Sequence, residues 1–390
     1  MCRASFVSNL AAHFGVIGSA LMLACRPDNA ASIADVGSRM NEAVLTPVDS
    51  ITLVESDSLL LGRVGQGFDV DNEGSLYVAA SSFGKIIRYT AAGQPVMVYG
   101  RYGSGPGEFR HVFPVVAVAE SVVLGSASFG RRVNVFRRSD GTPLATVRYA
   151  GFVTTLVQSG DTLYFGNFSR RDSAGVGAVP LGSLLSSEAD SRYPLQPRLA
   201  AIPSEYYQFS ELELSSDVRV ARRSSDLLAA YAPMDWILVF RSPASGPDTI
   251  RVPARIRKGF DREVLSQHFV KDRYRFDTAV ESLSLLEGIW VLASGEVALI
   301  HMDTRATMRG RTVVSVAASA YLTILSVDLA QACVDIPIPA ERLSRPVVTV
   351  KSDRLYVLEQ IVSDNPEPIA STIVRTYRID SRTCNWVPVG

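Results

Sequence analysis

The segment IRYTAAGQPV, residues 87–96, consists of an apolar strand, a glycine-containing turn and the start of a returning strand. The same pattern returns in VFRRSDGTPL at 135–144, and in looser form at 238–250, 325–338 and 376–389. Two apolar runs joined by a short turn that contains glycine are typical of a β-hairpin. The chain therefore contains a hairpin that recurs along most of its length.

An apolar strand precedes each hairpin. Copies of it lie at 76–78, 122–124, 163–165, 289–291 and 355–357, with a further copy at 227–231. Six four-stranded units between residues 62 and 389 have about 55 residues each, somewhat more than common propeller repeats, and we assign the additional length to insertions at 169–200, 252–276 and 303–319. Because such a unit cannot bury both faces alone, the units are expected to stack around an axis. The sequence predicts an all-β fold, a six-bladed β-propeller of four-stranded antiparallel blades.

A glycine-rich connection, YGRYGSGPGEF at residues 99–109, opens the second unit. It resembles the opening of NHL-type repeats, a family of propellers with the pattern Gly-x-x-Gly-x-Gly-Pro-Gly-x-Phe, and NEGSLYV at 72–78 fits the same family. This resemblance covers residues 65–115 and implies the propeller fold; the chain also looks like bacterial six-bladed propeller lipoproteins. The connection itself needs positive φ angles, which glycine adopts without steric cost. Phe109 is expected to fold back into the core between two blades.

The amino-terminal 25 residues have the pattern of an export signal. One charged residue, a mostly apolar run and a small residue before a cysteine form a stretch too short for a confident membrane span. LMLAC at 21–25 resembles a bacterial lipobox, which implies lipidation of Cys25; an ordinary signal is the alternative. We therefore predict a signal at 1–25, a flexible linker at 26–50 and a propeller at 51–390. The expected location is the cell envelope, as an outer-membrane or periplasmic lipoprotein.

The two cysteines of the predicted propeller give conflicting indications. A cysteine pair in an exported domain favours a disulfide. Aligning the repeats, however, places Cys333 and Cys384 at the start of the outermost strands of adjacent blades, which diverge, and a disulfide needs Cα atoms within about 7 Å. We therefore expect two separate thiols. The same alignment takes all four strands of the last blade from the C-terminal end, so that residues 51–56 add at most an edge strand.

The composition indicates neither a nucleic-acid ligand nor a catalytic centre. The 39 basic and 39 acidic residues give a net charge of zero, which supplies no overall attraction to nucleic acid. Beyond the signal, the chain has only His111, His268 and His301, each isolated, and no His-x-His, Cys-x-x-Cys or His-Glu-x-x-His spacing. A Gly-x-Ser-x-Gly elbow is also absent. We therefore expect no catalytic residue and no cofactor.

A metal-dependent hydrolase or lyase is the alternative to a non-catalytic protein. Gluconolactonase-like propellers, which this chain is similar to in its expected blade number, bind a divalent ion with carboxylates and an Asn at the channel mouth. Candidates here for an ion such as calcium are Asp69, Asp71, Asn167, Asp217 and Glu287. They are scattered along the chain, and Asp and Asn at strand ends are ordinary turn formers.

A basic segment is the main departure from the strand pattern. Residues 251–275 carry eight basic and three acidic side chains, and 260–269 is compatible with a short helix that caps the channel or merely packs on it. The candidate ligand-facing residues are Arg101, Tyr102, His111, Arg257, Lys258 and Arg262. We predict a lipid-anchored, monomeric binding platform for an envelope protein, peptide or glycan; a structural scaffold without a small ligand is a further alternative.

Overall fold

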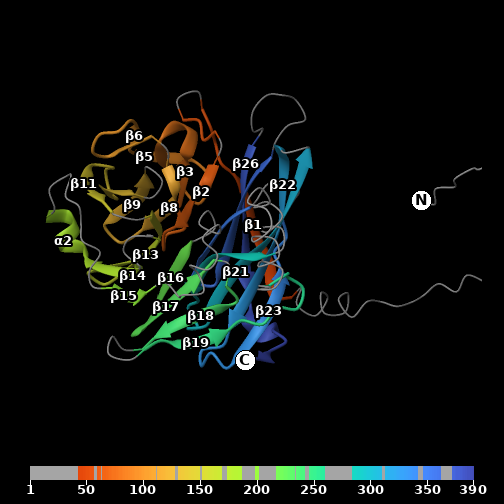
Figure 1. Ribbon diagram of the computed structural model, residues 1–390. Helices are drawn as coiled ribbons and strands as arrows, with labels where there is room; N and C mark the ends of the chain where they lie inside the picture. Colours follow the sequence, from red (N-terminus) through yellow and green to blue (C-terminus); the bar gives the residue numbers. More distant parts are fainter. Residues whose placement is uncertain are drawn as a thin grey trace, which may run out of the picture.

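A computed structural model describes residues 43–56, 59–62, 64–110, 112–127, 131–149, 152–168, 174–186, 198–201, 217–232, 234–241, 246–259, 283–309, 312–340, 346–361 and 371–390. The chain forms six antiparallel sheets, the blades of a β-propeller (Figure 1). The innermost strands of the blades contact one another in a closed ring. They are β2 (Val64–Val70), β8 (Val112–Val118), β12 (Phe152–Ser159), β16 (Val218–Arg223), β20 (Ser284–Val291) and β24 (Val347–Lys351).

The remaining strands extend each blade outward. Blade 1 adds β3 (Leu76–Ala80), β4 (Lys85–Tyr89) and β5 (Pro95–Tyr99). Blade 2 adds β9 (Val122–Ala127), β10 (Arg132–Arg137) and β11 (Pro143–Arg148). Blade 3 adds β13 (Thr162–Phe168), β14 (Ala174–Pro180) and β15 (Arg198–Ala201), with helix α2 (Leu181–Ser186) after β14. Blade 4 adds β17 (Asp226–Tyr231), β18 (Trp236–Phe240) and β19 (Asp248–Arg251). Blade 5 adds β21 (Val297–Arg309), β22 (Thr312–Leu325) and β23 (Gln331–Pro337), and blade 6 adds β25 (Arg354–Ile361) and β26 (Ser371–Ile379).

The two ends of the propeller carry different connections. Each innermost strand runs from one end, here called the upper face, to the other, the lower face, and the next strand returns. The upper face therefore holds the connections between blades and the turns between second and third strands. The lower face holds the remaining turns.

The core lies between neighbouring blades. In β3, Leu76 and Val78 pack with residues of blade 6, whereas Tyr77 and Ala79 pack with residues of blade 2. Because successive side chains of a strand point to opposite faces, a strand between two blades is buried on both sides. This explains why a second strand such as β3 is a continuous apolar run and does not alternate between apolar and polar residues.

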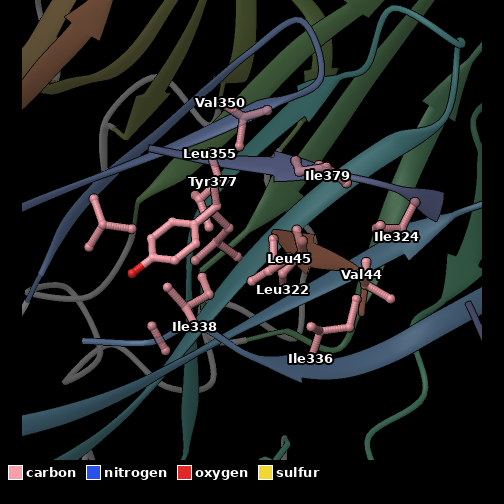
Figure 2. Close-up of a cluster of buried hydrophobic side chains, with 14 of the residues drawn as sticks. Val44, Leu45, Leu322, Ile324, Ile336, Ile338, Val350, Leu355, Tyr377 and Ile379 are labelled. Atoms are coloured by element: carbon pink, nitrogen blue, oxygen red, sulfur yellow. The ribbon is translucent and has the colours of Figure 1, made fainter. Parts of the chain in front are cut away.

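Blade 6 is completed by the N-terminal strand β1 (Leu45–Thr52), which pairs with β26. Figure 2 shows Val44 and Leu45 among buried side chains of blades 5 and 6. The prediction that the C-terminal end supplies all four strands of the last blade is therefore wrong. The fold begins at β1, before the predicted boundary at residue 51, so the last residues of the predicted 26–50 linker belong to blade 6.

The C-terminal segment crosses from blade 6 to blade 5. Because β1 occupies the outermost position of blade 6, the chain leaves that blade after β26 through the 3-10 helix η3 (Ser381–Thr383). The short strand β27 (Val387–Pro388) then pairs with β23. This crossing brings Cys384 to Cys333, and the two form a disulfide with a Cα–Cα distance of 5.6 Å. The expectation of two separate thiols is therefore wrong, and so is the prediction of a hairpin at 376–389. Both predictions place the C-terminal segment as the outermost strand of blade 6.

The six-bladed fold with four-stranded antiparallel blades is confirmed, although blade 5 gains a fifth strand from β27. One strand was assigned to the wrong position: residues 289–291 lie on the innermost strand β20, and the second strand of blade 5 is β21. The predicted signal and Cys25 lie outside the described residues. In the part of the chain that is described, no helix has the length and apolar character needed to cross a membrane.

Candidate functional site

The glycine-rich connection of the predicted ligand-facing set lies on the upper face between blades 1 and 2. Gly100 and Gly107 have φ angles of 73° and 69°, and Phe109 is fully buried beside Phe136, as the sequence predicts. A Cβ atom on Gly100 would lie 2.4 Å from the Phe109 ring. Glycine is therefore required here both for its backbone conformation and for the close approach of the ring.

Blade 2 fixes this connection with buried polar side chains. The Arg132 guanidinium donates to the carbonyl oxygens of Ser104, at 2.7 Å, and Glu108. Asn134 donates to the same Glu108 carbonyl at 2.9 Å, and Thr146 Oγ1 accepts the Gly107 N–H at 3.1 Å. These anchors are not predictable from the sequence, because a buried Arg on a strand carries no motif that identifies it.

The fixed connection presents Arg101 and Tyr102 to solvent. They form the short strand β6 (Arg101–Tyr102), which pairs with β7 (Glu108–Phe109). Tyr102 is 63% exposed, and Arg101 Nε donates to Glu108 Oε1 at 2.8 Å. Both predicted ligand-facing residues are thus accessible on the upper face.

Arg257 is not ligand-facing, in contrast to the prediction. Its side chain is 1% exposed and lies 3.0 Å from Asp335 Oδ1, while Asp335 Oδ2 accepts the backbone N–H groups of residues 255–257. Asp335 has a φ of 55°, in the left-handed region, within an irregular part of β23. The segment 252–259 is therefore folded onto blade 5 around the Asp335 carboxylate. The same carboxylate compensates the positive charge of Arg257.

The other candidates of the basic segment differ in position. Lys258 is exposed, and its Nζ donates to the Thr304 carbonyl at 2.9 Å. Arg262, His111 and the predicted helix at 260–269 lie outside the described residues. His301, on the adjacent strand β21, is buried, and desolvation together with the charge of Arg257 lowers the pKa of its imidazole well below the ordinary value.

A second polar site lies in the central channel. The innermost strands of all six blades surround a cavity of about 250 Å³. Its lining includes charged residues of both signs, a glutamine and a tryptophan. These are Asp69, Gln158, Arg219, Glu287, Trp290 and Lys351.

Asp69 joins blades 1 and 2 at the lower end of this channel. Its carboxylate accepts the backbone N–H of Val70 at 2.8 Å and that of Val118 at 2.7 Å. Burial raises the pKa of Asp69 to about 6, although the positive charge of Lys351 and both hydrogen bonds act in the opposite direction.

Bulges in the innermost strands direct polar side chains toward the axis. The register of β20 with β21 shifts between Leu286 and Gly288, which leaves Glu287 as the extra residue, and β12 has a similar shift at Thr154. A β-bulge re-aims side chains in this way. Arg219 donates to the Thr154 carbonyl at 2.8 Å and to Asp217 Oδ2 at 2.7 Å. Arg219 and Lys351 are not among the candidates predicted from the sequence, since those predicted for the channel are all metal ligands.

The five predicted metal-ligand candidates do not all converge. Asp69 and Glu287 line the channel, whereas Asp71 accepts from Arg138 Nη2 at 2.7 Å and Asp217 pairs with Arg219. The backbone of Asn167 lies in β13, and its side chain is outside the described part. Among the residues described, no three His, Cys, Asp or Glu side chains form a group able to hold a metal ion.

Comparison with known proteins supports the fold. No family model matches the chain, and no curated protein sequence matches it. Similar solved structures include a "putative exported protein" from Bacteroides fragilis (TM-score 0.52, 14% identity, covering 87% of this chain and 96% of that one). They also include a member of the DUF4221 family from Bacteroides vulgatus (TM-score 0.54, 10% identity, covering 86% and 98%). At this identity the similarity shows a shared propeller architecture.

Proposed function

We propose that the protein is exported, anchored to a membrane through lipidated Cys25, and acts as a non-catalytic platform whose upper face binds a protein, peptide or glycan of the cell envelope. The observation that carries this proposal is the place where the chain joins the propeller. Val44 lies at the lower face, where its carbonyl accepts the Asp380 N–H at 2.9 Å. A tether that ends there attaches at the lower face and leaves the upper face clear of the anchor.

The construction of the upper face also supports binding. Arg132, Asn134 and Thr146 hold the glycine-rich connection, and Asp335 holds the segment 252–259. Ordering these loops in advance reduces the entropy lost on binding a partner. Exposed Tyr and Arg side chains such as Tyr102 and Arg101 are the types most often found at the centres of binding surfaces. The structurally similar Bacteroides fragilis protein is a "putative exported protein", which agrees with this location.

The experiment compares two positions of similar exposure on opposite faces. A photo-crosslinking residue replaces Tyr102, 63% exposed on the upper face, or Val327, 54% exposed on the lower face, in the full chain within its native cells. We expect a discrete adduct from position 102 and none from position 327, and we expect Cys25→Ala to move the protein from the membrane to the soluble fraction. Adducts only from position 327 would overturn the orientation.

The metal-dependent alternative rests on one observation, the presence of both Asp69 and Glu287 in the channel wall. Elemental analysis of the purified full chain separates it from the proposal. Near-stoichiometric calcium that survives dialysis and is lost in Glu287→Gln would favour the hydrolase or lyase. Activity assays on lactones and esters would then follow.

A further inference from the structure

The channel contains two cations and two anions from four different blades. Lys351 ends the innermost strand of blade 6 and Asp69 lies near the end of that of blade 1, so both are at the lower end. Arg219 of blade 4 and Glu287 of blade 5 line the other side. Charges of opposite sign thus face one small space from neighbouring blades.

Asp69 and Lys351 influence each other without forming an ion pair. Lys351 lowers the pKa of Asp69, yet no contact within 4.0 Å between them occurs in the described part of the chain. Asp69 is half-buried and, within the described residues, accepts two backbone N–H bonds, so its carboxylate retains acceptor capacity. The half-buried Lys351 ammonium carries three donors. Both groups are therefore able to bind a ligand that enters between them.

The size and charge of the cavity restrict that ligand. A volume of about 250 Å³ corresponds to about eight water molecules, which accommodates a small metabolite and excludes a folded segment. Because Lys351 and Asp69 present opposite charges to the same space, an anion or a cation alone would meet repulsion as well as attraction. A molecule that carries both charges would satisfy both sides of the channel and offset the desolvation of the buried charges.

We propose that the central channel binds a small zwitterion of the free α-amino acid class, with the ligand carboxylate on Lys351 and its ammonium group on Asp69. Arg219 on the opposite wall is 8% exposed and forms an ion pair with Asp217, so its charge is already compensated within the protein. Gln158 and Thr155 add hydrogen-bonding groups toward blade 3. This site is separate from the partner surface of the upper face and goes beyond the proposed function.

Calorimetric titration of the full chain tests this with three matched probes. Alanine carries both charges, lactate replaces the ammonium group by a hydroxyl, and ethylamine lacks the carboxylate. We expect alanine to bind at least about tenfold more tightly than either single-charge probe, because each charged hydrogen bond contributes this much or more. Lys351→Met and Asp69→Asn should each weaken alanine binding by a similar factor. Arg354→Met, which changes the exposed partner of Lys351 on the adjoining strand, should leave binding unchanged.

Three results would overturn the proposal. They are equal binding of all three probes, undetectable binding of glycine, alanine and serine at millimolar concentration, or unchanged alanine affinity in Lys351→Met. Circular dichroism and thermal melting of each variant confirm that it is folded. Crosslinking from position 102 reports on the upper face alone, so failure of the zwitterion site and failure of the binding platform are distinguishable.

Discussion

Asp69 shows how a single half-buried charge links stability to pH. Its pKa is raised from 3.8 to about 6, chiefly by burial, so the folded protein binds this proton more tightly than the unfolded chain does. The neutral form is favoured in the fold, and ionisation of Asp69 therefore reduces the free energy of unfolding as the pH rises from about 4 to about 6. Above pH 6 the full reduction is present, up to about 3 kcal/mol.

The Asp69→Asn variant removes this titration. Urea unfolding at several pH values should show the variant gaining stability relative to the unmodified protein between pH 4 and 6, and a constant difference above pH 6. Asp71→Asn is the control, because the Ser75 N–H and Arg138 outweigh burial there and lower the pKa of Asp71. That variant should show a much smaller change of the difference over the same range, because the Asp71 charge is only a minor cause of the raised Asp69 pKa. If the difference in unfolding free energy between Asp69→Asn and the unmodified protein did not change with pH, the Asp69 carboxyl would be well solvated.

At the residue scale, the sequence predicts local backbone conformation better than contacts between side chains far apart in the chain. The positive φ angles of the glycine-rich connection and the burial of Phe109 follow from local residue types, and both are confirmed. The sequence places Arg257 among the ligand-facing candidates because it lies in the basic segment 251–275, which departs from the strand pattern. Its burial depends on Asp335, which is 78 residues away in the chain, and only the packing of blade 5 against its preceding connection brings the two together.

The glycine-rich connection is the element whose sequence is most tightly constrained. Gly100→Ala would place a Cβ atom in the left-handed region and 2.4 Å from the Phe109 ring. We expect the free energy of unfolding to fall by about 1–3 kcal/mol, because backbone strain and overpacking add. Thermal and urea unfolding measure the loss.

Two other glycines of the chain serve as controls that separate backbone strain from overpacking against the Phe109 ring. Gly160 also has a positive φ, 57°, but nothing lies within 4 Å of its added Cβ, so Gly160→Ala reports on backbone strain alone. Gly182, in helix α2, has open space and no positive φ, and Gly182→Ala should be neutral or slightly stabilising. A Gly100→Ala loss no greater than that of Gly160→Ala would show that the Phe109 ring moves aside at little cost.

At the element scale, hairpins were predictable and strand order within a blade was less so. The hairpins β4–β5, β10–β11, β18–β19 and β22–β23 follow from apolar runs around glycine or polar turns. Residues 289–291 were placed on the second strand of blade 5 although they lie on the first. Both strands are apolar because both are buried between blades, so composition does not distinguish them.

At the scale of the whole molecule, closure of the ring is the feature that local sequence could not reveal. The pairing of β1 with β26 joins residues more than 300 positions apart, such as Leu45 and Ile379. The repeat pattern favours a fourth strand of blade 6 from the C-terminal end. No periodicity in residues 45–52 indicates which blade edge they complete. The same closure frees the C-terminal segment to cross to blade 5, which accounts for the disulfide as well.

Ring closure can be tested within one strand of the full chain. Leu45 is 7% exposed in the core shared by blades 5 and 6, whereas Val48, on the same strand, is 48% exposed. If β1 closes the propeller, Leu45→Ala should lower the free energy of unfolding by about 2–5 kcal/mol, because it leaves a cavity between two blades. Val48→Ala should change it by less than about 0.5 kcal/mol. Hydrogen exchange of the β26 amides supplies the second measurement, since they should exchange faster in Leu45→Ala only. Equal, small effects of both substitutions would mean that the outermost position of blade 6 is not filled by β1 in solution, and that the ring is held instead by the crossing of the C-terminal segment to blade 5.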